Sequence, residues 1–325
     1  MNILYILGNG FDKAQGMATS YPDFYNYLKT YEGSKLLEQL KKAINTNTKL
    51  WSDMEEAFGL YTAQISSKSD FISLYEELSE QLQIHLKSEE SKFIPTSEQK
   101  DKFLRDFISP GKYLGELAKQ QFHQYLERYK NENKFFYVMT LNYTNTLEKL
   151  LSIDSTKPNK ERSFSNNSSL QKIIHVHGEL GSSIIIGVDN EMQIANEAFR
   201  NDEDIKDWLI KIQSNHVMEL MRHEECENLI TRANLIILYG VSLGETDLRW
   251  WKIIGEELKK RDNIAIIQHL YKPNAIKATT MQRMGQLRRE HINHLVKKMG
   301  LKSEDKVETL LSRMFFTVNA DIFKK

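Results

Sequence analysis

The chain opens with the stretch NILYILGNGFD, residues 2–12. Its apolar half, residues 2–7, favours a buried central strand of a parallel sheet, because such strands are covered on both faces. The run breaks at Gly8 and Gly10, which indicates a tight turn that opens a helix. At turns of this kind a phosphate or ribose can approach the main chain. The next glycine is Gly16, so the usual dinucleotide fingerprint is incomplete, and the turn fits either a ligand loop or an ordinary bend.

Later apolar runs predict the other strands of the sheet. They cover residues 135–141, 172–180, 183–188, 234–239, 264–270 and 315–318. Helical patterns lie between most of them, and this alternation is typical of the α/β class. We therefore expect a single α/β domain over residues 1–325, with a Rossmann-like, mostly parallel sheet flanked by helices.

Two segments interrupt this pattern. Residues 35–131 carry apolar side chains at helical spacing, which predicts a large helical insertion or cap. Within it, Ser52 stands three residues before Glu55, the pattern of a capping box followed by solvated acids. Residues 154–169 are rich in Ser, Asn and Lys and have no apolar period, so we expect an exposed connection there.

Composition narrows the class of protein. The 325 residues include 44 basic and 44 acidic side chains, a balance that argues against a dedicated binder of nucleic acid or anionic membranes. The single cysteine, Cys226, excludes an internal disulfide and a four-cysteine zinc site. No stretch approaches the length of a membrane span. We expect a cytoplasmic protein without membrane contact.

Polar side chains follow several predicted strands at the point where each strand ends. Asn142 and Thr144 follow residues 135–141, and His177 stands directly before a glycine. Ligands gather at this edge of α/β sheets, so these residues are candidates for chemistry. By strand alternation His175 and His177 share one face, but no nearby cysteine or acid has convincing ligand spacing. We predict no metal site.

A second strand–glycine–helix junction follows residues 234–239. Gly240 and Gly244 flank Ser242, whose hydroxyl and neighbouring backbone donors could receive a phosphate. Asp247 either belongs to this site or complements the dipole of the helix that follows.

Taken together, four motifs resemble, in order, the signature of the sirtuin-like fold. They are Gly8-Asn9-Gly10-Phe11-Asp12, Leu141-Asn142-Tyr143-Thr144, His175-Val176-His177-Gly178 and Gly240-Val241-Ser242-Leu243. The resemblance is closest to the AbiH family, bacterial proteins of abortive infection against phage, and it covers nearly the whole chain. It implies that Asn142 and His177 are catalytic and that NAD is the substrate. The implied NAD-binding residues are Gly8, Asn9, Gly10, Phe11, Asp12, Thr144, Gly240, Ser242, Leu243 and Asp247.

The expected function is release of nicotinamide from NAD during anti-phage defence. Protein deacetylation is not expected, since sirtuin deacetylases carry a four-cysteine zinc ribbon and this chain has one cysteine. The alternatives are a nucleotide-sensing module without turnover, transfer of ADP-ribose to a macromolecule, and a nucleic-acid effector that uses the basic stretch near Arg288. A trigger from phage or host and a homo-oligomer formed through the insertion are further expectations.

Overall fold

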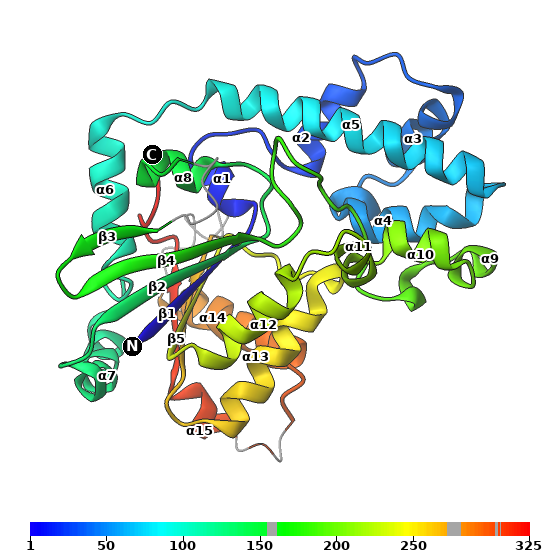
Figure 1. Cartoon of the computed structure of the whole chain (residues 1–325). Helices are drawn as coiled ribbons and strands as arrows, with labels where there is room; N and C mark the ends of the chain where they lie inside the picture. The colour runs from blue at the N-terminus through cyan, green and yellow to red at the C-terminus, as the bar shows by residue number, and fades with distance from the viewer. Residues whose placement is uncertain (155–160, 272–280, 303–304, 306) are drawn as a thin grey trace.

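The computed structural model describes residues 1–154, 161–271, 281–302, 305 and 307–325. Within these residues, strands form one seven-stranded sheet in the order β3-β4-β2-β1-β5-β6-β7 (Figure 1). The strands are β1 (Asn2–Leu7), β2 (Lys134–Thr140), β3 (Arg162–Ser165), β4 (Ser168–His175), β5 (Leu235–Tyr239), β6 (Ala265–Leu270) and β7 (Met314–Val318). The predicted α/β class is confirmed.

The sheet has the connectivity of a Rossmann-like fold. β3 pairs antiparallel with β4, and every other pairing in the sheet is parallel. Numbered along the chain, the parallel strands lie in the spatial order 3-2-1-4-5-6. β1 pairs with β2 on one side and β5 on the other, so the strand order reverses between β1 and β5. Ligand clefts of doubly wound sheets form at this crossover point.

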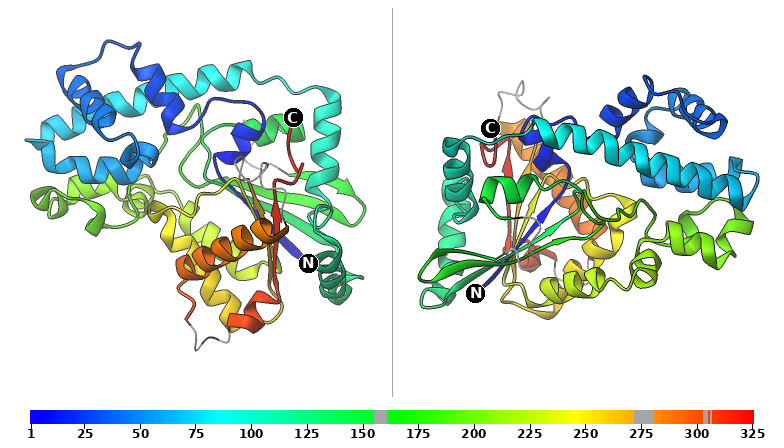
Figure 2. Two further views of the ribbon diagram at one scale, coloured as in Figure 1. Left: turned by 180° about the vertical axis from the view of Figure 1, so that it is seen from behind. Right: turned by 45° about the horizontal axis from the view of Figure 1, so that its top comes forward.

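Helices cover both faces of the sheet (Figures 1 and 2). Ile3, Tyr5 and Leu7 of β1 pack against one helix layer, and Leu4 and Ile6 pack against the other. The first layer contains α6 (Ser97–Phe107), α7 (Glu116–Leu126) and α8 (Thr146–Leu151); the second contains α12 (Arg222–Arg232), α13 (Leu248–Lys260), α14 (Met281–Lys298) and α15 (Val307–Leu311). None of the helices in the described part of the chain combines the length and apolar character needed to cross a membrane.

A third group of helices forms a cap beside the sheet, with a hydrophobic core of its own. It comprises α2 (Tyr21–Leu28), α3 (Lys35–Thr46), α4 (Met54–Tyr61) and α5 (Lys68–Lys92), joined by α9 (Glu197–Arg200) and α10 (Glu203–Leu209). The predicted insertion, residues 35–131, therefore supplies two layers: α3 to α5 build the cap, whereas α6 and α7 cover the sheet. The cap also needs residues from far along the chain.

The cap explains why residues 183–188, predicted as a strand, form none. The segment makes only an isolated bridge, between Val188 and Ile210 of the cap. Ile184, Ile186 and Val188 are buried in the cap core rather than in the sheet. The backbone of this segment meets the chain after β4 only beyond the end of the strand, where Ile185 N donates to His177 O at 2.8 Å.

The neighbourhood of β4 also differs from the prediction. β4 begins at Ser168 and β3 spans Arg162–Ser165, so a hairpin occupies much of the expected connection 154–169. Residues 155–160 of that connection lie outside the described residues. β4 ends at His175, so the expectation that His175 and His177 share a strand face is wrong.

The sheet centre depends on close contact between two glycine turns. Gly8 N donates to Tyr239 O at 3.0 Å, and Gly10 N donates to Gly240 O at 2.9 Å. A Cβ on Gly10 would stand 2.5 Å from Gly240 Cα, and one on Gly240 would stand 2.5 Å from Phe11 N. Gly240 also has a φ of +68°, which other residues rarely adopt.

We expect Gly240→Ala to destabilise the fold by at least about 2 kcal/mol. The added methyl group would overlap the backbone of the first glycine turn, and alanine is strained at a positive φ. Thermal or denaturant unfolding measures the loss. Gly115→Ala is the matched control, since that glycine has φ −65° and no atom within 4 Å of an added Cβ. Equal stability of the two variants would contradict the assigned role of the turn contact.

Candidate functional site

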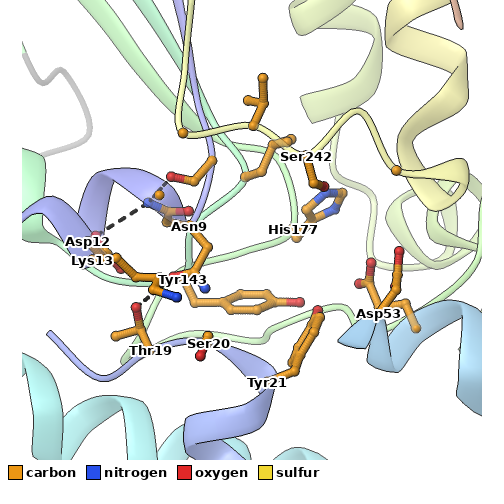
Figure 3. Close-up of a pocket in the computed structure, with 18 of the residues that line it drawn as sticks. Asn9, Asp12, Lys13, Thr19, Ser20, Tyr21, Asp53, Tyr143, His177 and Ser242 are labelled. Atoms are coloured by element: carbon orange, nitrogen blue, oxygen red, sulfur yellow. Dashed lines mark hydrogen bonds between the residues drawn. The ribbon is translucent and has the colours of Figure 1, made fainter. Parts of the chain in front are cut away.

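A cavity of about 420 Å³ lies between the carboxyl ends of the central strands and the cap (Figure 3). Residues from the turns after β1, β2 and β5 form one wall, and residues of α2, α4 and α5 form the opposite wall. The cavity is therefore at the crossover point of the sheet, where Rossmann-like proteins bind ligands.

Most of the predicted site residues meet in this cavity. Those that line it are Gly8, Asn9, Gly10, Asp12, Asn142, Thr144, His177, Gly240, Ser242 and Asp247. Phe11 and Leu243 do not. Phe11 is 1% exposed and packs edge-on against Tyr239 and Phe323 in one sheet layer, while Leu243 is buried in the other. Both residues follow a glycine turn but point into the core.

The glycine turns differ from a phosphate loop in their hydrogen bonds. The N–H groups of Gly8 and Gly10 are used in the contact with β5, and Phe11 N donates to Gly8 O at 2.8 Å. Added Cβ atoms at Gly8 and Gly10 would strike the backbone of Gly240. The contact between the turns is therefore enough to require both glycines, with or without a ligand.

Asn142 is held against the first turn by its side-chain amide. Its Nδ2 donates to Gly8 O at 3.2 Å and to Asp12 Oδ1 at 3.3 Å. Thr144 Oγ1 donates to Asp12 Oδ2 at 2.7 Å. Because both N–H groups of the amide are used, Oδ1 is the group that Asn142 has left for a ligand.

Asp12 is a buried carboxyl group in this cluster, only 2% exposed. Burial raises its pKa to about 7, although hydrogen bonds from Thr144 and Thr146 oppose the shift. Near neutral pH, Asp12 can therefore either accept or donate a hydrogen bond through its carboxyl oxygens.

His177 is oriented by a carboxylate. Its Nε2 lies 3.1 Å from Asp247 Oδ1, and its Nδ1 is buried with no hydrogen-bond partner among the described residues. Burial lowers the pKa of His177, and the charge of Lys211 lowers it further against the opposing effect of Asp247. The imidazole is thus neutral at pH 7, with its proton on Nε2 toward Asp247 and its lone pair on Nδ1.

Lys211 of α11 (Lys211–Val217) extends this contact to the cap. Its ammonium group donates to Asp247 Oδ1 at 3.0 Å, to Glu55 Oε2 at 2.8 Å and to Thr246 O at 3.1 Å. Burial lowers the pKa of Lys211, but the two carboxylates more than compensate and raise it. Burial likewise raises the pKa of Asp247, but the charges of Lys211 and His177 and the hydrogen bonds that both donate together outweigh burial and hold the pKa low. Lys211 and Asp247 are therefore a charged pair.

The sequence analysis did not predict several residues in or beside the cavity as part of the site. Ser52 does not cap α4; the cap is Asp53, which accepts from Glu56 N at 3.3 Å. Glu55 is 5% exposed and paired with Lys211, instead of solvated. Lys211 itself lies in a polar helical stretch with no local signal that separates it from other lysines. The sequence analysis assigns Ser52 and Glu55 to a capping box, and that assignment is wrong.

Two tyrosines lie opposite His177. Figure 3 shows the hydroxyl ends of Tyr21 and Tyr143 pointing toward one another, below His177 and to the left of Asp53 in this view. Tyr143 Oη donates to Ile185 O at 3.0 Å, so the segment that failed to form a strand holds this ring in place. The pair presents aromatic surface beside carboxylates, an arrangement suited to a flat or cationic group.

Charge is unevenly distributed around the cavity. The acidic lining residues are Asp12, Asp53, Glu55 and Asp247, and the basic one among those that line it is Lys13. A carboxylate-rich wall suits sugar hydroxyls and cationic rings better than a polyanion.

A second cluster lies behind Asn142. Glu148, His175 and Glu179 offer ligand atoms within 4.8 Å of one another. His175 Nδ1 contacts Asn142 O at 3.0 Å, and its Nε2 contacts Glu148 Oε1 at 2.8 Å. The spacing along the sequence had not suggested an acidic partner for His175. As the structure stands, the imidazole links Glu148 to the Asn142 backbone, a structural role that needs no metal.

Comparison with protein families gives one match. The model described as "Bacteriophage abortive infection AbiH" matches residues 4–269, which include most of β1, all of β2 to β5 and every predicted site residue. A comparison with curated proteins found no match.

We expect Asp12→Asn to change how stability depends on pH. Folding raises the pKa of Asp12 from its value in the unfolded chain, near 4, to about 7. The contribution of this carboxyl to stability is therefore greatest below about pH 4 and is lost as the pH rises through about 7. The side chain at position 12 does not titrate in Asp12→Asn, so this variant does not lose that stability as the pH rises. Relative to wild type, the free energy of unfolding of Asp12→Asn should rise by about 2.5 kcal/mol between pH 5 and 8. Denaturant unfolding at both pH values measures this, and a difference independent of pH would contradict the shift.

Proposed function

The chain belongs to the bacteriophage abortive infection AbiH family, and from this premise we propose that it acts in phage defence by hydrolysing the bond between nicotinamide and ribose in NAD. The observation that supports this most is a single cavity, at the crossover point of a Rossmann-like sheet, that collects His177, Asn142 and Asp12. Family membership implies the role in abortive infection; the chemistry, and with it the sirtuin-like character of the fold, is our proposal.

The reaction needs little acid catalysis from the protein. The bond between ribose C1′ and the pyridinium nitrogen breaks with its electron pair going to the nitrogen, so the cationic ring leaves as neutral nicotinamide. An oxocarbenium-like ribosyl group remains and is attacked at C1′ by water. The products are nicotinamide, ADP-ribose and one proton. The protein must hold the ribose, orient the water and accept the proton.

His177 is suited to accept that proton. It is neutral at pH 7 because burial and Lys211 lower its pKa, and Asp247 fixes the proton on Nε2. Because Nδ1 is buried and has no hydrogen-bond partner among the described residues, ligand binding has to bring the attacking water to it; Nδ1 then takes the proton as the new C–O bond forms. Asp247, which the sequence suggested as an NAD-binding residue, serves in this proposal to orient the base.

Asn142 and Asp12 are suited to hold the ribose. Both N–H groups of Asn142 are bound within the fold, which leaves Oδ1 to accept from a sugar hydroxyl or the attacking water. Asp12 can bind a second hydroxyl. Asp53 and the ring faces of Tyr21 and Tyr143 offer the cationic nicotinamide a place near His177. The side of the cavity near Lys13 is left for the phosphates.

Two alternative functions would use the same cavity. A nucleotide sensor would bind NAD or ADP-ribose without turnover, and an ADP-ribosyltransferase would replace water by a macromolecular acceptor. The proposal also includes control by a trigger from phage or host, or by homo-oligomerisation, because unregulated loss of NAD would harm the cell itself.

We expect His177→Ala to slow nicotinamide release by about a hundredfold to ten-thousandfold, the usual contribution of a general base. Asn142→Ala should lower the rate by at least about tenfold, through lost orientation. His216→Ala and Asn201→Ala are matched controls at exposed positions and should stay within about twofold of wild type. Incubation with NAD and chromatography of nicotinamide gives the rates. Tight NAD binding with no release under any activating condition would favour the sensor.

The nucleic-acid alternative makes a different prediction. The exposed Arg288 and Arg289 of α14 are its strongest support, but the cavity wall is acidic. We expect Arg288→Glu with Arg289→Glu to leave nicotinamide release unchanged, since neither residue lines the cavity. We also expect only weak binding of DNA or RNA at 150 mM salt. Tight binding with a steep salt dependence that both substitutions abolish would overturn our assignment in favour of a nucleic-acid effector.

A further inference from the structure

Four ionisable side chains form a continuous chain of contacts from the cap to His177. Glu55 of α4 contacts Lys211 of α11, Lys211 contacts Asp247, and Asp247 contacts His177. The distances are 2.8, 3.0 and 3.1 Å in that order. Lys211 is 3% exposed and Glu55 is 5% exposed, so their contact is shielded from solvent, whereas the Asp247 side chain is 16% exposed and borders the cavity.

Lys211 can occupy this place only because its partners surround it. Its three N–H groups are all used, by Glu55, Asp247 and Thr246 O. A buried ammonium ion without such partners would cost several kcal/mol. One of these partners, Glu55, belongs to the cap, whereas Asp247 and Thr246 precede α13 under the sheet. The charged lysine therefore depends on a docked cap.

We propose that Lys211 is a positioning residue for His177: it keeps Asp247 ionised and the imidazole neutral, and Glu55 tethers it there from the cap. Lys211 Nζ and His177 Nε2 contact the same atom, Asp247 Oδ1, so they lie within about 6 Å of each other. At that distance a positive charge disfavours protonation of the imidazole. The chemistry proposed above would then be available only while the cap is closed on the sheet.

Other groups near His177 do not replace Lys211. Asp247 acts in the opposite direction and favours the imidazolium. Arg222 of α12 lowers the pKa of His177, but less than Lys211 does. His223, on the same helix, is itself buried, which lowers its pKa to about 3, so it carries no charge at neutral pH. Glu55 contacts Lys211 rather than His177, and burial raises its pKa to about 7 against the charge of Lys211.

The test is direct titration of His177 in the full chain by ¹H–¹⁵N NMR of its ring, assigned through the signals lost in His177→Gln. Lys211→Met should raise the pKa of His177 by about one unit or more, because it removes the nearby positive charge. Lys252→Met, which removes an exposed lysine of α13, is the matched control and should leave that pKa within a few tenths of a unit. Glu55→Gln keeps an acceptor for Lys211 and should also change it little.

If Lys211→Met does not fold, the double variant Glu55→Gln with Lys211→Met, which removes both ends of the cap contact, is titrated instead. It should show the same upward shift. A His177 pKa that is the same in wild type and the Lys211 variants, or that moves equally in Lys252→Met, would overturn the proposal.

Only the kinetic consequence of this inference rests on the proposed function. If NAD is the substrate, the acid limb of the pH–rate profile of nicotinamide release should move upward in Lys211→Met by as much as the titration does. The NMR result stands without turnover. If the pKa of His177 shifts as expected but NAD is not cleaved, the proposed enzyme activity is refuted and the positioning role of Lys211 stands. If NAD is cleaved but the pKa does not shift, the positioning role is refuted and the enzyme activity stands.

Discussion

Two glycine turns press their backbones together where the strand order of the sheet reverses, and the rest of the structure depends on this contact. Gly10 N donates to Gly240 O at 2.9 Å, closer than side chains on either residue would permit. Beyond the contact the chain diverges: Phe11 enters the core on one face of the sheet, and Leu243 enters the core on the other. The cavity opens between these diverging segments.

The cap closes the cavity with a different kind of interaction. Its own core is apolar and draws on residues 24–86 together with residues 184–210. Where it meets the sheet edge, however, the contact runs through buried charges, with Glu55 on one side of Lys211 and Asp247 on the other. Such pairs add little net stability, because desolvation offsets their attraction, but removal of one partner leaves a costly buried charge. They favour one docked position of the cap over others.

The two walls of the cavity therefore have separate tasks in the function we propose. The sheet side presents Asn142 and Asp12, held by hydrogen bonds to the first turn and to Thr144. The cap side presents Asp53 and Tyr21, and through Lys211 it influences His177. A ligand that spans the cavity would touch both walls, so ligand binding and cap closure would favour each other.

The sequence by itself determined the α/β class, the strands from β1 to β7 apart from β3, and the edge of the sheet where polar residues collect. These follow from local apolar runs and from glycines that stop them, which are properties of neighbouring residues. It did not reveal that Gly8 and Gly10 serve a backbone contact with Gly240, that residues 183–188 belong to the cap, or that Glu55 and Lys211 meet. Only the tertiary structure decided these, because each joins segments that are not neighbours in the sequence, 156 residues apart for Glu55 and Lys211. The residues on either side of a buried ion pair also do not differ from those around a solvated one.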